Sequence, residues 1–254
     1  MAQVRSRQGR KRHVQQALFR HGGKRKGAGR KPKGGRAGSA HQRRPVVTAS
    51  DALHVVLRVV PEVGSLRRRE MYRAMREATI VAAVRERIRI VHISLQRTHV
   101  HLVVEVEDAR SLSRGMQGFQ ISAARNVNTV LADGRGRRRR GRVFAERYHV
   151  EVVRSPRHAR RVVGYVLLNW RKHGEDRSGL PSTWLVDPFS SGISFPDWRE
   201  LEGKNVMWPM RETYDPLVVR RPASWLLREG WKRAGAISAR DVPGRSSVAG
   251  CRRG

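Results

Sequence analysis

Cysteine is almost absent from this chain, because Cys251 is the only one among 254 residues. A disulfide within the chain and a zinc site built from several of its cysteines are therefore excluded. Long apolar runs are missing as well, and no stretch approaches the ~18 uninterrupted apolar residues of a membrane-spanning helix. The basic N-terminal segment lacks the apolar region and the small-residue cleavage site of a secretory signal, so we expect a cytoplasmic protein.

Acidic residues are scarce throughout. The chain has 21 Asp and Glu residues against 54 Lys and Arg, which gives a formal charge of +33. A charge this large exceeds what solubility requires and indicates a polyanionic partner, for which nucleic acid is the first candidate. An anionic membrane surface is the alternative, but the sequence contains no basic amphipathic anchor. The length favours one well-buried domain with extensions over two full domains.

The first 44 residues contain no acidic residue and are rich in Lys, Arg and Gly. This composition cannot bury enough apolar surface to offset the entropy of ordering the chain, so residues 1–45 are expected to form a disordered basic arm. Within the arm, Gly22–Arg36 is similar to an AT-hook peptide, which enters a narrow A·T-rich minor groove. The alternatives are a non-specific phosphate-binding segment and a solvated tail. The candidate DNA-binding residues of the arm are Arg25, Lys26, Arg30, Lys31 and Lys33.

Seven segments with regular patterning follow Pro45. Apolar and β-branched runs predict strands at Ala52–Val60, Ile88–Leu95, His99–Val106 and Tyr148–Val153. Three longer segments predict helices at Leu66–Arg85, Ser111–Leu131 and Pro156–His173, the first two opened by Ser65 and Ser111. The order strand, helix, strand, strand, helix, strand, helix is typical of an α+β fold. We expect a ferredoxin-like antiparallel sheet with helices mainly on one face.

Two histidines stand two residues apart in the third predicted strand, at His99 and His101. Side chains at this spacing leave the same face of a strand, so two imidazoles can converge on one metal ion. The alternating residues Val100, Leu102, Val104 and Val106 are apolar and point to the opposite face, where helices can pack. The alternative is that both histidines are merely half-buried strand residues. His92, on the neighbouring strand, is a possible partner of the pair and otherwise structural.

The third predicted helix carries Tyr165 and Asn169 at i and i+4, which places a phenol and an amide on one helical face. A nucleophile and a third metal ligand would need this placement. The alternatives are an ordinary helix aromatic and a helix-end asparagine. Of the other tyrosines, Tyr148 is the nearest rival nucleophile, whereas Tyr72 and Tyr214 have no comparable setting.

The pattern His99-Val100-His101, followed by a helix with Tyr165 and Asn169, resembles the single-tyrosine HUH transposases of insertion sequences. Within them it is most similar to the REP-associated tyrosine transposases, over roughly Ala52–His173. The resemblance implies that His99, His101 and Asn169 bind a divalent cation, Mg²⁺ or Mn²⁺. A departure is Leu168-Asn169-Trp170, where relatives often have Asn-Pro, and this leaves the end of the helix open.

The resemblance also implies a mechanism. The Oη atom of Tyr165 would attack a phosphate of single-stranded or hairpin DNA, leaving a 5′-phosphotyrosine and a free 3′-OH, and a later 3′-OH would rejoin the strands. Ligand type alone cannot choose the metal, because imidazoles also bind Zn²⁺ and Ni²⁺. The oligomeric state, monomer or homodimer, stays open.

The predicted organisation has four parts. After the arm, residues 46–178 form the HUH catalytic domain, residues 179–243 an irregular C-terminal extension, and residues 244–254 a disordered tail. All six tryptophans lie between Trp170 and Trp231, so the extension is expected to pack on the core, with a short helix near Ala223–Arg233. An Arg-rich loop precedes the fourth strand, and its candidate DNA-phosphate contacts are Arg137, Arg138, Arg139 and Arg140.

These observations predict a metal-dependent DNA transposase that is nucleoid-associated. The alternative is a non-catalytic basic DNA- or RNA-binding protein, in which the positive charge is the whole function and the histidine pair is structural. The sequence has no Walker loop to suggest use of ATP. A metal-dependent nick that requires one tyrosine separates the two interpretations.

Overall fold

The computed structural model describes residues 45–85, 88–177, 184–204, 208, 210 and 212–244. The predicted basic arm with its candidate DNA-binding residues therefore lies outside the described residues, except for its last residue. Most of the predicted C-terminal tail lies outside them as well. No helix among the described residues is long and apolar enough to cross a membrane.

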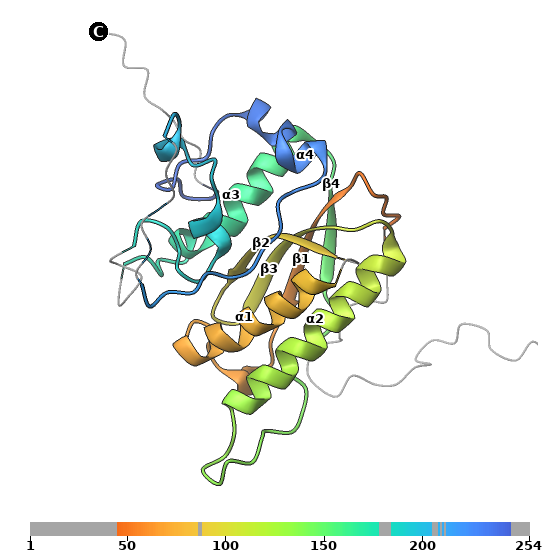
Figure 1. The fold of residues 1–254 in the computed structure, drawn as a ribbon, viewed down its shortest axis with the longest axis vertical. Helices are drawn as coiled ribbons and strands as arrows, with labels where there is room; N and C mark the ends of the chain where they lie inside the picture. The colour runs from red at the N-terminus through yellow and green to blue at the C-terminus, as the bar shows by residue number, and fades with distance from the viewer. Residues whose placement is uncertain are drawn as a thin grey trace, which may run out of the picture. The chain divides into compact units, whose positions relative to one another are not determined.

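Four strands form one antiparallel sheet in the order β2-β3-β1-β4 (Figure 1). The strands are β1 (Ala52–Arg58), β2 (Arg89–Leu95), β3 (His99–Glu105) and β4 (His149–Val153). The long helices are α1 (Arg69–Val84), α2 (Ala109–Val130) and α3 (Pro156–Lys172). The connection β1-α1-β2-β3-α2-β4 in this strand order is the ferredoxin-like arrangement, so the predicted fold class is confirmed.

The sheet has a helix layer on each face. On one face, α1 and α2 lie side by side over alternate strand residues such as Leu53, Val55 and Leu102 (Figure 1). On the other face, α3 packs against the remaining set, which includes Val91 and Val103. Two of the three long helices thus share one face, and the third covers the face that carries His99 and His101. This alternation follows from the period of two in a strand.

The helix starts differ in detail from the predictions. Ser65 does not cap α1, because its hydroxyl accepts a hydrogen bond from the Arg67 backbone N–H at 3.2 Å and the N-cap, Arg68, makes no side-chain cap. Ser111 does not open α2, since Asp108 is the N-cap and accepts from the Ser111 N–H at 2.6 Å. A carboxylate is a stronger acceptor than a hydroxyl and also complements the positive end of the helix dipole, which explains the earlier start.

The C-terminal section packs on the outer side of α3. Trp198 and Trp231 are almost fully buried there, and Trp170 of α3 is fully buried as well. The short helix expected near Ala223–Arg233 is split into α4 (Trp225–Arg228) and a 3-10 turn. The 3-10 turns of the described residues are η1 (Pro61–Val63), η3 (Ser191–Ser194), η4 (Arg199–Leu201) and η5 (Gly230–Ala234).

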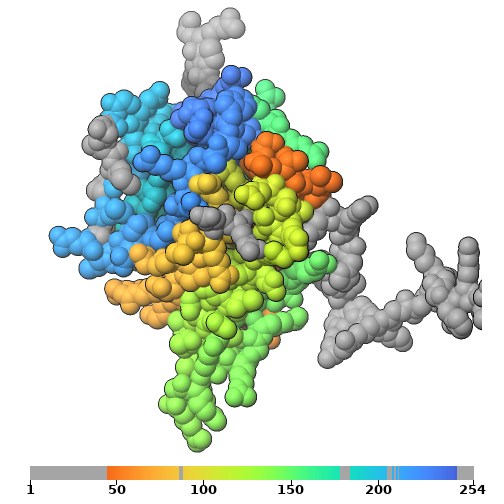
Figure 2. Space-filling model, turned by 45° about the vertical axis from the view of Figure 1, so that its right-hand side comes forward, coloured from red at the N-terminus to blue at the C-terminus, as the bar shows by residue number. Residues whose placement is uncertain are grey.

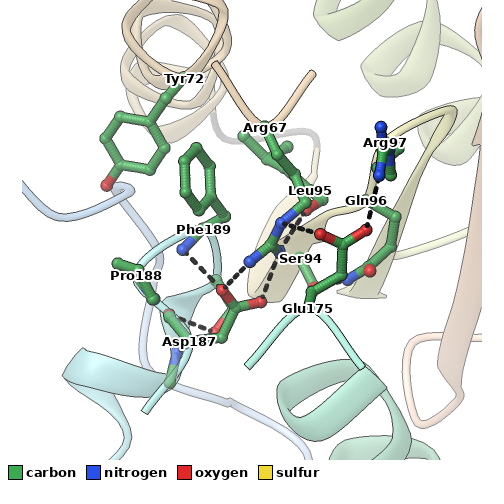
Figure 3. Close-up of polar contacts among 12 residues, drawn as sticks. Arg67, Tyr72, Ser94, Leu95, Gln96, Arg97, Glu175, Asp187, Pro188 and Phe189 are labelled. Carbon is green, nitrogen blue, oxygen red and sulfur yellow. Dashed lines mark hydrogen bonds and ion pairs between the residues drawn. The ribbon is translucent and has the colours of Figure 1, made fainter. Parts of the chain in front are cut away.

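A buried ion pair ties the C-terminal section to the loop before α1 (Figure 3). Both terminal nitrogens of Arg67 donate to Asp187, at 2.9 and 3.0 Å, and one of them also donates to the Leu95 carbonyl at 3.1 Å. The Asp187 side chain is fully buried and that of Arg67 is 4% exposed. Glu175 lies 3.8 Å from Arg67 on the other side. Such bidentate geometry fixes the position of both chain segments at once.

Candidate active site

The strand β3 places both histidines of the HVH motif on the face covered by α3. Their ring centroids lie 4.7 Å apart with the planes nearly perpendicular. His101 is buried at 4% exposure, while His99 is partly exposed. Val100, Leu102 and the residues that alternate with the histidines belong to the opposite core, as their spacing predicts.

The helix α3 brings Tyr165 against this pair. The Tyr165 ring centroid lies 5.2 Å from that of His101, in an edge-to-face arrangement. Ser155 caps the helix by accepting from the His158 N–H at 3.2 Å, and Pro156 occupies its first turn, so the start of α3 is well defined. The phenol is therefore held over the histidine by a rigid element and not by a loop.

Asn169 lies one turn after Tyr165 and is fully buried. The helix continues to Lys172, and the Asn169 backbone carbonyl accepts from the His173 N–H at 3.2 Å, so Asn169 belongs to the body of α3. Neither its side-chain oxygen nor its side-chain nitrogen has a hydrogen-bond partner in the described part of the chain, and the same is true of His101 Nε2. Buried polar groups without partners are costly, so these atoms require a ligand or a function.

His54 of β1 is a part of the site that the sequence reasoning did not single out. Its Nε2 atom lies 3.1 Å from His101 Nδ1, and its ring centroid lies 6.1 Å from that of Tyr165. In the register of the sheet, His54 pairs with Val103 and is the diagonal neighbour of His101. A histidine at an inward position of the otherwise apolar run Ala52–Leu57 was the available signal.

The family model described as "Transposase IS200 like" matches residues 48–167, a segment that contains the histidine pair and Tyr165. Residues 48–167 are therefore similar to the IS200-like transposases. The chain is also similar to a solved REP-associated tyrosine transposase bound to a REP hairpin, with 18% identity, a TM-score of 0.49, and coverage of 73% of this chain and 100% of that one. No curated protein matches it.

Burial keeps the histidines of this site neutral. It lowers the pKa of His101 to about 2, and the neighbouring His54 and His99 contribute in the same direction. Burial also lowers the pKa of His54 to about 4, against the opposing effect of Glu151. The pKa of His99 is lowered for the same reason. Neutral imidazole is the form that binds a metal ion.

The residues fit the divalent metal that the family resemblance implies. His101 Nε2 and the side-chain amide of Asn169 are buried and have no partner among the described residues, and His99 stands beside His101 on β3. Within the described ranges, no three His, Cys, Asp or Glu side chains form a metal-binding group. The amide oxygen of Asn169 is the further protein ligand that the sequence resemblance adds to the two histidines.

Tyr165 opens on a basic pocket of about 560 Å³ between α3 and the C-terminal section. Arg161, Lys172 and Arg240 line it and are exposed or partly exposed. Lys172 Nζ lies 5.1 Å from the centre of the Tyr165 ring. Burial raises the pKa of the Tyr165 hydroxyl, so the phenol resists ionisation even with these cations beside it.

The other candidate residues lie away from this cluster. Tyr72 donates to the Asp215 carbonyl at 2.7 Å, and Tyr214 donates to the Pro188 carbonyl at 2.8 Å, so both hydroxyls hold the C-terminal section in place. Tyr148 is buried in the core between the sheet and the pair α1 and α2. His92 packs on the Phe195 ring, with centroids 5.4 Å apart, and its Nδ1 atom has no partner in the described part of the chain.

The Arg-rich loop projects past the C-terminal end of α2 and is green in Figures 1 and 2. Its arginines line a groove of about 1020 Å³ together with Asn128. Arg137 pairs with Asp133 at 2.9 Å and Arg139 donates to Asn128 at 2.9 Å, so these two hold the loop. Arg138 and Arg140 are exposed and have no ion pair among the described residues. Both therefore remain available to a phosphate.

Proposed function

We propose that this transposase domain nicks and rejoins single-stranded DNA through Tyr165, by a 5′-phosphotyrosine intermediate, with a divalent metal held by His99, His101 and Asn169. The observation that carries the proposal is the position of the Tyr165 ring against His101, whose outward nitrogen is buried and has no partner, while Asn169 lies unpartnered one turn further along the same helix.

In the proposed reaction, Tyr165 Oη attacks one DNA phosphorus atom. The new bond joins the phenol oxygen to phosphorus, the phosphorus–O3′ bond breaks, and the phenol proton leaves to solvent while the departing oxygen becomes a 3′-OH. One phosphodiester replaces another, so the step needs no nucleotide hydrolysis. In the second step a 3′-OH attacks the phosphotyrosine, and the phenol is restored.

The main chemical difficulty of this reaction is that a neutral tyrosine is a weak nucleophile. A tyrosine with a pKa near ~10 is only about a thousandth ionised at neutral pH, and burial raises the pKa of Tyr165 further. When bound, the metal would polarise and orient the phosphate. The neutral His99 and His101 supply the nitrogen lone pairs that hold it, and Lys172 and Arg161 place positive charge beside the phenol.

DNA binding is proposed to rest on dispersed cations rather than on the metal. The pocket next to Tyr165 would take the phosphate of the attacked strand, and Arg138 and Arg140 would contact phosphates further along it. The arm, with Arg25, Lys26, Arg30, Lys31 and Lys33, would add affinity in the same way. We further propose a substrate that folds into a hairpin, which is what the resemblance to REP-associated transposases implies.

The test is the formation of a covalent protein–DNA adduct. Labelled single-stranded DNA from the flanks of the gene is incubated with the protein and Mn²⁺, then resolved on a denaturing gel, and the linked peptide is identified by mass spectrometry. The wild-type protein should form the adduct at Tyr165, and Tyr165→Phe should not, because the substitution removes one oxygen and little volume. Tyr148→Phe is the matched control and should retain it.

Two outcomes would reject the proposal. An adduct formed by Tyr165→Phe, or a DNA-bearing peptide that contains Tyr148, would place the chemistry elsewhere. If the protein binds DNA but forms no adduct at any metal concentration, the non-catalytic nucleic-acid-binding alternative is favoured.

A further inference from the structure

A chain of polar side chains extends from His101 away from Tyr165 and across the sheet. His101 Nδ1 contacts His54 Nε2 at 3.1 Å, and His54 Nδ1 lies 3.9 Å from Glu151 Oε2 on β4. The other carboxylate oxygen of Glu151 lies 3.3 Å from His158 Nε2, in the first turn of α3. Three neighbouring elements, β3, β1 and β4, thus contribute one side chain each to a continuous line.

The contact between the two imidazoles has a direction. A hydrogen bond between two neutral rings needs one N–H donor and one lone-pair acceptor. His101 Nε2 is the buried atom without a partner among the described residues, and it can bind a metal only if it carries no proton. The single proton of neutral His101 must then sit on Nδ1 and be donated to His54 Nε2.

This assignment also settles the proton of His54. When His54 Nε2 accepts, the proton of its neutral ring is on Nδ1, which faces the Glu151 carboxylate. At 3.9 Å the carboxylate is too far for a hydrogen bond, but its negative charge favours the tautomer of His54 with the proton on Nδ1. His158 adds a second contact that holds the carboxylate in place. Every nitrogen and oxygen along the line has a compatible role.

We propose that His54 is a positioning residue that holds His101 in the tautomer with a free Nε2 lone pair, and that Glu151 orients His54 for this task. The inference rests on the proposed function, because it concerns the metal ligand His101. It assigns a role to two residues outside the HVH motif. Partners of this kind fix the orientation of a ligating histidine, and their loss typically lowers metal affinity by about 10- to 100-fold.

The sheet supplies a matched control. Val103 of β3 is flanked by a histidine on each side, His54 on β1 and His92 on β2. Both are buried on the same face, but His92 packs on Phe195, and no contact between His92 and His101 is found among the described residues. Replacing either histidine by leucine therefore removes the same buried imidazole at mirror-related positions, and only one of the two should affect His101.

The first measurement is Mn²⁺ binding by calorimetric titration of the full chain without DNA. His54→Leu should weaken binding by about 10- to 100-fold. His54→Gln should restore most of it, because the terminal atoms of glutamine reach the position of Nε2 and can offer an acceptor oxygen. Glu151→Ala should cause a smaller loss than His54→Leu, and His92→Leu should leave the affinity unchanged. Equal affinities for wild type and His54→Leu, or equal losses for His54→Leu and His92→Leu, would overturn the proposal.

The second measurement uses the protein with His54 and Glu151 unchanged and requires no metal. Nitrogen-15 NMR of the metal-free protein distinguishes the two neutral tautomers of a histidine, and the His101 signals are assigned by their loss in His101→Gln. We expect the proton on Nδ1, and a proton on Nε2 would overturn the proposal even if His54→Leu failed to fold. If the wild type binds no Mn²⁺, the proposed metal site fails as well. If the wild type and His54→Leu bind Mn²⁺ equally well, the metal site stands and only the proposed positioning role of His54 is rejected.

Discussion

The two faces of the sheet bear different residues although the same strands build them. On the face toward α1 and α2, strand β3 contributes Val100, Leu102 and Val104, all fully buried among apolar neighbours. On the face toward α3, the intervening positions are His99 and His101, beside His54 of β1. One face is closed by apolar packing, whereas the other keeps buried polar atoms that have no partner among the described residues.

This difference shows how a small domain separates stability from chemistry. A period of two lets a single strand serve both purposes, because neighbouring residues face opposite layers. The unpartnered atoms of His101 and Asn169 are a cost to the folded state, and the apolar face offsets it. Substitutions at adjacent positions of β3 should therefore have unlike effects.

The largest effect is expected for His101→Ala. Cleavage of single-stranded DNA should fall below detection because the proposed metal loses a ligand, while DNA binding should stay close to wild type, since it depends on dispersed Lys and Arg. Cleavage assays with Mn²⁺ and fluorescence anisotropy measure the two properties separately. His99→Ala should behave in the same way, and full cleavage by either variant would reject the metal assignment.

The neighbouring substitution Leu102→Ala tests the opposite face. Leu102 is fully buried between the sheet and the helices, so its truncation should lower the free energy of unfolding by about 2–5 kcal/mol. The fraction that remains folded should still form the DNA adduct. Urea denaturation gives the first quantity and the adduct gel the second. A variant as stable as the wild type would show that this face is not the main source of stability.

The two faces should also differ in their response to pH. Burial lowers the pKa of His92, on the α3 face, from 6.5 to about 4. Between pH 6.5 and about pH 4 the unfolded chain binds more protons than the folded chain. The stability that His92 contributes is therefore complete above pH 6.5 and is lost as the pH falls through this window. The contribution of His92 is on the order of 3 kcal/mol.

Urea denaturation of the wild type and His92→Leu at about pH 7 and about pH 4 checks this contribution. The variant should lose less stability on acidification than the wild type. Buried histidines of the described core are found on the α3 face, at His54, His92 and His101, and none belongs to the core beneath α1 and α2. An unchanged pH dependence would mean that the acid sensitivity arises elsewhere.

The smallest effect is expected in the loop beyond α2. Arg138 and Arg140 have no ion pair in the described structure, so the double substitution to Gln should leave the fold intact and weaken DNA binding. The slope of log affinity against log salt should flatten by about 0.7 for each phosphate that the loop no longer neutralises. Adduct formation at saturating DNA should not change. A slope equal to that of the wild type would show that the loop does not reach DNA.

Patterns local in sequence predicted most of the fold. The strands and long helices lie within a few residues of their predicted bounds, because period-two and helical patterning are read from a single segment. The candidate site residues could be identified for the same reason. His99 and His101 lie in one strand, and Tyr165 and Asn169 lie in one helix. The fold places the strand beneath the helix, as the predicted order of elements requires.

Contacts that depend on register could not be predicted in this way. His54 reaches His101 only because β1 pairs with β3 in one particular alignment, and Glu151 follows from the pairing of β4 with β1. His92 was the neighbour considered from sequence, but the bulge between Ile90 and His92 and the packing of Phe195 give it another environment. The start of α2 was missed because the Asp108 carboxylate is a stronger acceptor than the nearby Ser111 hydroxyl, whereas α1 begins after Arg68 without a side-chain cap.

The buried pair of Arg67 and Asp187 limits how this protein can recombine with its relatives. The segment shared with the family ends at residue 167, whereas Asp187 lies in the C-terminal section. A chimaera that joined this domain to a foreign C-terminal section would remove Asp187 and leave the buried Arg67 guanidinium with the longer contact to Glu175 at 3.8 Å. Losing one partner of such a buried pair costs roughly 3–5 kcal/mol. That is a large part of the roughly 5–15 kcal/mol that stabilises a typical domain. The two parts are therefore expected to be inherited as one module, with Arg67 and Asp187 changing together or not at all.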